Sequence, residues 1–349
     1  MPTWTPSTEL SATQLTPSAF IVALPKAELH LHLEGAVEPP TLVELSRRHD
    51  PAPLDFAAVE QLYNYTDFPG FLDAFAAVTQ RLCDPADYEL ITYRLMERLH
   101  AQGVLHAEVY VSVGICLRRR QDFDALFDGM ERGRERGAKD FGVSLLWIFD
   151  FVRQWGPEAA EHVVEKAIQF RGRNVIGIGM GGDERQAAPE LFREVYQQAA
   201  AHGLRLTAHA GEAAGPESVL GALDALGAER IGHGLNAWHD PELVARLVRD
   251  QVPVEICVTS NLRTGCLRSL SRHPLRKYFD AGVLVTLNSD DPAMFRTSLA
   301  REYQLAQDAF GFSDDELRYV AASSFRASFL PEEAKQRHLA GFTAPAPRL

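Results

Sequence analysis

The sequence predicts one closed barrel of eight parallel strands, each followed by a helical segment, which is the (β/α)8 or TIM-type α/β fold. Eight short apolar or β-branched runs recur along the 349 residues, and stretches with helical spacing lie between them. No linker-like change in composition, internal repeat or low-complexity block divides the chain. A doubly wound open sheet shares the same alternation and is the alternative fold.

The strands are expected where short apolar runs stand between turn residues. These runs are 27–33, 104–111, 143–151, 174–180, 204–208, 230–231, 253–258 and 283–287. Helices are expected between them, and several have Pro in the first turn, as at 157–164, 189–192, 215–220 and 240–244. After the first strand we expect a helical lid, because one helical face carries Phe68, Phe71, Leu72 and Phe75. Ordinary core packing is the alternative for that face.

The two ends of the chain are expected to lie outside the barrel. No Lys or Arg occurs in the first 25 residues, which are rich in Ser, Thr and Pro and lack the basic start of a secretory signal. We therefore predict a flexible arm at 1–20, a barrel domain at 21–335 and a C-terminal tail at 336–349.

Composition restricts the partners. Asp plus Glu number 47 against 35 Lys plus Arg, a formal charge of −12, which argues against nucleic acid or an anionic membrane surface. The sequence contains no run of about 20 apolar residues, which is the length that a membrane-spanning helix requires. The four cysteines, Cys83, Cys116, Cys257 and Cys266, form no C-x-x-C pair and suggest a reducing, cytoplasmic location. A small-molecule substrate is expected, and the oligomeric state is left open.

His30 and His32 are the first candidate site residues. Residues two apart in a strand point to the same side, so both imidazoles are expected to project from one face of an apolar strand. Two neutral imidazoles on one face are strong ligands for a cation such as zinc. A chance pair in a half-exposed strand is the alternative.

Further candidate residues follow other expected strands. His209 and Glu212 follow the fifth, His233 the sixth, and Asp290 and Asp291 the eighth. Each has an ordinary explanation, since His beside Gly is common in loops and Asp-Asp-Pro is a frequent helix start. In a barrel, however, catalytic residues gather at the carboxyl ends of the strands, and closure makes the first and eighth strands neighbours. The side chains are therefore expected to meet.

These motifs resemble those of the adenosine deaminase branch of the amidohydrolase superfamily, from Leu24 to about Phe329. The segments 24–35, 209–212 and 287–292 are similar to its opening, central and closing signatures. The resemblance implies a metal-dependent hydrolase barrel with one zinc ion per chain. It also assigns the residues: His30, His32, His209 and Asp290 as zinc ligands, Glu212, His233 and Asp290 as catalytic groups, and His32, Glu34, Gly182 and Asp291 as substrate contacts.

The chemistry of these residue types agrees with that assignment. Zinc lowers the pKa of a bound water to about 7, and Asp290 and His233 are placed to orient that water and to take or share its proton. Attack at C6 of an adenine ring requires a proton at N1, which a buried, protonated Glu212 supplies. Asp291 is expected at N7. A helix cap is the alternative for both Glu212 and Asp291.

The substrate is expected to be a 6-aminopurine nucleoside such as adenosine. Free-adenine deaminases usually carry Asp-His-Gly where this chain has Gly232-His233-Gly234. Glu34 stands where adenosine deaminases commonly have an Asp that touches ribose, so the sugar contact is open. Aminodeoxyfutalosine deaminase shares a Glu at this place, and its benzoate-bearing substrate is the first alternative, with Arg118–Arg120 or Arg153 facing the carboxylate. Free adenine is the second.

Other classes fit less well. Two-metal hydrolases of the superfamily usually have a carboxylated lysine at the end of the fourth strand, where this chain has Met180-Gly181-Gly182. A binding protein without catalytic activity would be expected to lack one of the expected metal ligands or Glu212, and none of them is missing from this sequence. The H-x-E and P-C-x-x-C signature of cytidine deaminases is absent from the sequence.

Overall fold

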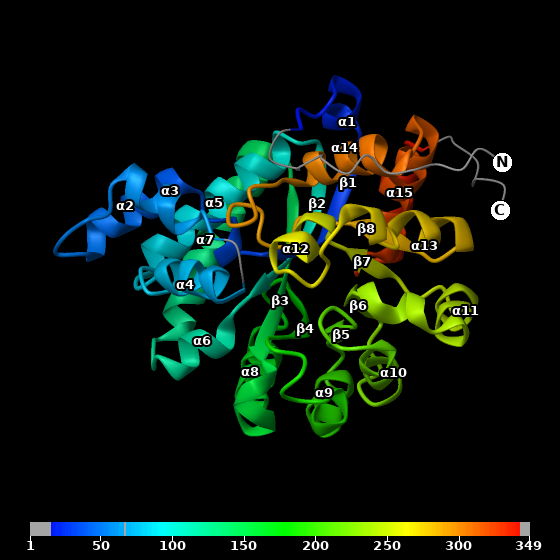
Figure 1. The fold of residues 1–349 in the computed structure, drawn as a ribbon. Coiled ribbons are helices and arrows are strands. Elements are labelled where there is room, and N and C mark those ends of the chain that lie inside the picture. Colours follow the sequence, from blue (N-terminus) through cyan, green and yellow to red (C-terminus); the bar gives the residue numbers. More distant parts are fainter. Residues whose placement is uncertain (1–14, 66–67, 343–349) are drawn as a thin grey trace.

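The computed structural model describes residues 15–65 and 68–342 and has the expected (β/α)8 architecture. Eight parallel strands follow one another in sequence order around the sheet, with helices outside them (Figure 1). The strands are β1 (Lys26–His32), β2 (Val104–Val111), β3 (Ser144–Val152), β4 (Val175–Gly181), β5 (Arg205–Ala210), β6 (Arg230–His233), β7 (Val254–Ile256) and β8 (Val285–Leu287).

The residues just after β8 close the barrel against β1. Leu31 and Asp290 form a parallel bridge. The His32 N–H donates to the Asp290 carbonyl at 2.9 Å, and the Asp290 N–H donates to the His30 carbonyl at 3.1 Å. The open-sheet alternative is therefore wrong, because the first and last strands are joined, and the same backbone bonds place Asp290 beside the two histidines.

Helices fill the connections, and an insertion separates β1 from β2. The connecting helices include α6 (Val113–Arg118), α7 (Phe123–Phe141), α8 (Gly156–Phe170), α9 (Arg193–Ala201), α10 (Pro216–Asp224), α11 (Pro241–Arg249), α12 (Val258–Arg263) and α13 (Leu275–Ala281). The insertion holds α2 (Pro39–His49), α3 (Phe56–Leu62), α4 (Phe68–Thr79) and α5 (Pro85–His100), and the chain after β8 forms α14 (Leu299–Phe310), α15 (Asp314–Ala327) and α16 (Glu332–Leu339). Within the described residues, no helix is both long and apolar enough to cross a bilayer.

The ends of the barrel differ from the expected boundaries. Helix α16 crosses the expected start of the tail at residue 336. This helix buries none of its residues, so it has no apolar periodicity from which it could be predicted. At the other end, α1 (Ala19–Ala23) overlaps the expected arm and is capped by the Ser18 hydroxyl. Residues 1–14 of the arm and 343–349 of the tail lie outside the described residues.

Helix α7 packs closely on α5 through glycines. A Cβ built on Gly129 would lie 2.0 Å from the Pro85 carbonyl oxygen, and one on Gly133 would lie 2.6 Å from the Glu89 carbonyl oxygen. These neighbours are backbone atoms, which cannot turn aside as the end of a flexible side chain can. The two helices therefore depend on the absence of side chains here.

We predict that Gly129→Ala destabilises the protein by about 1–3 kcal/mol, the usual effect of overpacking, although alanine is the better helix former. Urea denaturation measures this change. Gly172→Ala is the control, because its Cβ would meet no atom within 4 Å, and we expect a change within about 0.5 kcal/mol. Equal stability of the two variants would contradict the packing described here.

Candidate active site

A cavity of about 790 Å³ opens at the carboxyl ends of the strands. Its inner wall carries most of the expected site residues, and its outer wall comes from the helices around the opening. The inner lining includes His32, Gly182, His209, Glu212, His233, Asp290 and Asp291. The outer lining includes Phe71, Leu72, Phe75, Arg118, Arg119, Trp155 and Arg185.

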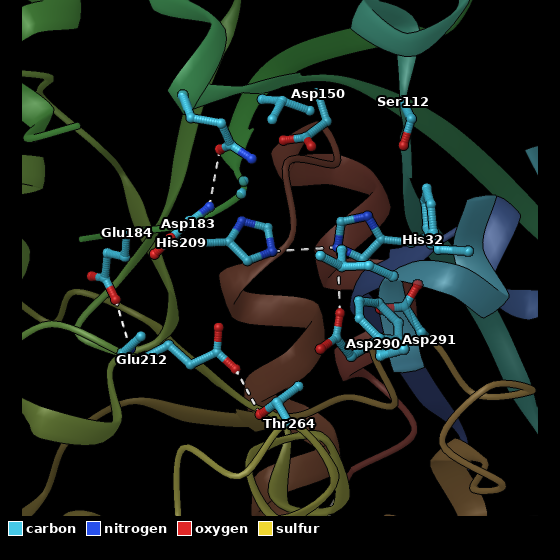
Figure 2. Close-up of a pocket in the computed structure, with 18 of the residues that line it drawn as sticks. His32, Ser112, Asp150, Asp183, Glu184, His209, Glu212, Thr264, Asp290 and Asp291 are labelled. Atoms are coloured by element: carbon cyan, nitrogen blue, oxygen red, sulfur yellow. Dashed lines mark hydrogen bonds and ion pairs between the residues drawn. The ribbon is translucent and has the colours of Figure 1, made fainter. Parts of the chain in front are cut away.

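Four expected metal ligands converge beside this cavity. One nitrogen or oxygen atom from each of His30, His32, His209 and Asp290 lies within 4.8 Å of the others. Asp290 Oδ1 is 3.4 Å from His30 Nε2 and 3.3 Å from His32 Nε2. His32 Nε2 is 3.3 Å from His209 Nε2, and Figure 2 shows these two rings facing each other. Alternation along β1 puts His30 and His32 on one side, as the sequence predicts.

The chemistry of the four side chains suits a metal ion. The Nδ1 of His30 bonds to Glu255 Oε2 at 2.8 Å, and the Nδ1 of His209 bonds to the Met180 carbonyl at 3.0 Å. Both acceptors fix the ring proton at Nδ1 and leave the Nε2 lone pair for the cluster. His30 Nε2 is buried and has no hydrogen-bond partner among the residues that the structure describes.

Electrostatics supports the same conclusion. Burial, together with the neighbouring imidazoles, lowers the pKa of His209. Burial also lowers the pKa of His32 to about 4, although the Asp290 charge opposes this shift. Both rings are therefore neutral. Burial also disfavours charge on His30, but Asp290 and Glu255 outweigh it and raise its pKa to about 10. The Asp290 and Glu255 carboxylates thus favour a positive charge between them, and a divalent metal ion can supply that charge.

Two site residues have strained backbones. Asp290 has φ +64° and His233 has φ +63°, in the left-handed region that residues other than glycine seldom adopt. Each such residue costs of order 1–3 kcal/mol and persists where the surrounding structure determines its conformation. Here the backbone hydrogen bonds between Asp290 and the end of β1 hold this conformation, and they thereby fix the direction of the Asp290 carboxylate.

Glu212 lies on the side of the cluster away from Asp150 (Figure 2), and His233 lies beside it. His233 Nε2 is 3.7 Å from Glu212 Oε2 and 3.9 Å from Asp290 Oδ2. Burial raises the pKa of Glu212, and the Asp290 charge adds to this, which favours the protonated acid. The loop that carries Glu212 is held by Glu184, which accepts the N–H groups of Ala213 at 2.7 Å and Ala214 at 2.9 Å.

The expected substrate contacts are only partly in the cavity. Gly182 lines it with φ +94°, and Asp291 lines it with an Oδ1 atom that has no hydrogen-bond partner. A Cβ on Gly35 would lie 1.8 Å from that oxygen, so Gly35 makes room for Asp291. Glu34 is fully buried, accepts the Ser112 N–H at 3.0 Å and is not among the lining residues. Its contact with a sugar stays a prediction.

The expected lid and arginines are also placed. Helix α4 contributes Phe71, Leu72 and Phe75 to the lining, whereas the Phe68 side chain lies outside what the structure describes. Arg118 and Arg119 line the cavity, and Arg120 does not. Arg153 is fully buried and donates to the backbone carbonyl of His209. Its guanidinium is therefore occupied and does not face the cavity.

Sequence reasoning missed two acidic residues. Asp150 on β3 lines the cavity with a buried Oδ1 that has no partner, and burial raises its pKa to about 8. Glu255 on β7 holds His30 and lies 2.6 Å from Arg230 Nε, as an ion pair without hydrogen-bond geometry. An acidic residue inside an apolar strand run, as in both cases, is the signal that could have found them.

Comparison with known proteins agrees with the site. The adenosine deaminase family profile matches residues 25–343. An aminodeoxyfutalosine deaminase of Streptomyces avermitilis is 38% identical over 91% of this chain and 90% of its own length. The crystal structure of an adenine deaminase from Arthrobacter aurescens superposes with a TM-score of 0.87 at 34% identity, covering 92% of this chain and 98% of that chain.

A structure with bound zinc is also similar. This amidohydrolase from Burkholderia ambifaria has a TM-score of 0.86 and 28% identity, and the match covers 97% of this chain and 95% of that chain. The profile match spans residues 25–343, a range that includes every expected site residue, and the 38% identity extends over 91% of the chain. The chain therefore belongs to the adenosine deaminase family and is a hydrolytic deaminase.

Proposed function

We propose that this protein is a zinc-dependent deaminase that converts a 6-aminopurine nucleoside, adenosine or an adenosine derivative, into the 6-oxo product and ammonia. The observation that carries the proposal is the convergence of three histidines and Asp290 beside Glu212, a partly buried acid whose pKa is raised. A zinc ion held there would lower the pKa of a water to about 7 and so supply a nucleophile at neutral pH.

The residues of the chain account for the remaining steps. Replacing the amine by oxygen requires a proton at ring N1, removal of protons from the attacking water and a proton for the departing ammonia. Glu212, whose raised pKa favours the protonated acid, gives its proton to N1 as the ring loses aromaticity. Once ionised, it can accept a proton for the leaving amine. His233 and Asp290 lie beside it and orient the water, and the Asp290 carboxylate accepts the proton that the water releases.

The purine is expected to sit with its N7 toward Asp291 and in contact with Gly182. Burial, together with the Asp290 charge, raises the pKa of Asp291 well above its usual range, so the neutral acid can donate to a ring nitrogen. Gly182 has no side chain, so its backbone can approach a planar ring closely. Phe71 and Phe75 on α4 provide apolar cover.

The dimensions of the cavity favour a substrate larger than free adenine. At about 790 Å³ it has room for a nucleoside with a group attached at the 5′ position. A specific observation supports aminodeoxyfutalosine as a second candidate: Arg118 and Arg119 line the outer cavity, where a carboxylate could bind.

The free thiols of all four cysteines support the expected cytoplasmic location.

We predict about one zinc ion per chain in protein purified without added metal, as expected for four protein ligands and a water position. Elemental analysis measures the ratio. His209→Ala should lose the metal, whereas His202→Ala, on the exposed end of α9, should keep it. Two ions per chain, or none after zinc is restored, would contradict this site.

We predict that Glu212→Gln keeps its zinc but loses about 10²–10⁴-fold in kcat, because the amide cannot supply the proton to N1. Steady-state kinetics and metal analysis on one preparation separate these two effects. Glu217→Gln, a nearby carboxylate at the start of α10, is the matched control and should stay active. Near-normal turnover of Glu212→Gln on every active substrate would refute its role as the acid.

We predict that nucleosides exceed free adenine in kcat/KM by at least about 100-fold, since binding energy from the sugar can assist the reaction at C6. Adenine, adenosine, 5′-methylthioadenosine, S-adenosylhomocysteine and aminodeoxyfutalosine should be compared. A preference for adenine would refute the nucleoside proposal.

The same comparison of kcat/KM, made on two arginine variants, tests whether the substrate carries an anionic group at its 5′ position. If the substrate carries an anionic 5′ group, Arg119→Gln should lower kcat/KM for it and leave adenosine unchanged. Arg120→Gln is the control, because Arg120 does not line the cavity. An equal effect of both variants on every substrate would argue against a carboxylate contact at Arg119.

A further inference from the structure

Two buried residues that do not line the cavity connect to the catalytic pair. Asn261 lies on α12, which follows β7, and His273 lies just before α13. Asn261 is fully buried and His273 is 4% exposed, and the cavity lining includes neither. Both side chains belong to one hydrogen-bond chain that ends at Glu212 and His233.

The backbone fixes the first member of this chain. The Leu275 N–H donates to His273 Nδ1 at 3.1 Å, so this nitrogen must be the acceptor of the ring. Burial, with a smaller contribution from His233, lowers the pKa of His273 to about 3, which keeps the ring neutral. A neutral ring whose Nδ1 accepts carries its proton on Nε2.

That proton orients the Asn261 amide. His273 Nε2 is 3.2 Å from Asn261 Oδ1, and since the ring donates here, the amide oxygen must face His273. The amide NH2 group then points the opposite way. It lies 3.1 Å from His233 Nδ1 and 3.5 Å from Glu212 Oε1. One N–H is thus available for the histidine and the other for the carboxyl of the acid.

The amide in turn determines where His233 holds its proton. Because Asn261 donates to Nδ1, neutral His233 carries its hydrogen on Nε2, the nitrogen that faces Glu212 and Asp290. We propose that Asn261 and His273 are positioning residues that fix His233 as the Nε2–H tautomer, so that it acts as a hydrogen-bond donor toward the attacking water. The proton released by the water then passes to a carboxylate and not to His233.

This inference rests on the proposed function only for its catalytic consequence, because the hydrogen-bond chain is a property of the protein alone. Nitrogen-15 NMR of protein labelled at histidine distinguishes a ring nitrogen that carries hydrogen from one that does not. We expect His233 and His273 both to carry hydrogen on Nε2, with and without zinc. Hydrogen on Nδ1 of His233 in the unaltered protein would overturn the proposal.

The informative variant is Asn261→Asp. A carboxylate only accepts hydrogen bonds, so it should draw the proton of His233 to Nδ1 and invert the tautomer. We expect kcat to fall by about 10²–10⁴-fold while KM changes little, as for a catalytic histidine held in the wrong tautomer. An unchanged NMR signature and an unchanged kcat would overturn the proposal.

Two substitutions of His273 separate orientation from packing. His273→Gln can still donate an amide N–H to Asn261 Oδ1 and should retain most of the activity and the tautomer of His233. His273→Leu removes the donor, frees the amide to turn over, and should give a mixture of His233 tautomers. If both variants fold and behave alike, His273 does not orient Asn261.

The same experiments distinguish the two proposals. A protein that shows the expected tautomers but deaminates no aminopurine would contradict the proposed function and leave the hydrogen-bond chain intact. A protein that holds zinc and is active on a nucleoside, yet carries the His233 proton on Nδ1, would contradict the role of Asn261 and leave the proposed function intact.

Discussion

A buried row of charges beneath the cluster of His30, His32, His209 and Asp290 is the constraint on which the site depends. Arg230 lies fully buried between Glu255, at 2.6 Å from its Nε, and Glu108. Burial disfavours the charged form of Glu108, but Arg230 and His106 outweigh it and hold its pKa at about 2. Two carboxylates and one guanidinium leave one net negative charge in the row. A cation beside His30 would balance this negative charge, because Glu255 bonds directly to the His30 ring.

The two walls of the cavity are built from different kinds of element. Its inner wall is built from strand ends whose backbone hydrogen bonds hold the strained conformation of Asp290. Its outer wall comes from helices, where the Phe71 ring stacks on Phe295 with centroids 5.1 Å apart and Arg118 lies 4.9 Å from the Trp155 ring. The reaction centre can therefore stay the same among relatives whose substrates differ beyond the purine.

Sequence reasoning reached the fold and the convergence of ligands because both follow from local periodicity and strand order. His30 and His32 are two residues apart in a strand, and closure of the barrel puts Asp290 next to them. The role of Glu255 depends on a hydrogen bond to a residue 225 positions away, which no local pattern encodes. The burial of Glu34 beneath Ser112 is equally a tertiary outcome. Helix α16 escaped prediction because none of its residues is fully buried and its sequence has no apolar periodicity.

The C-terminal segment has a consequence for how the protein is made. Arg230 donates to the Ala327 carbonyl at 3.2 Å and packs under the Phe329 ring, while the Phe329 N–H bonds to Glu108. The surroundings of Arg230 are thus completed by residues that follow all eight strands in the chain and leave the ribosome after them. A nascent chain that has already formed all eight strands still lacks the groups that complete the surroundings of Arg230. The geometry around His30 and Glu255 can therefore be completed only after the segment that follows β8 has been synthesised and has folded back onto the barrel.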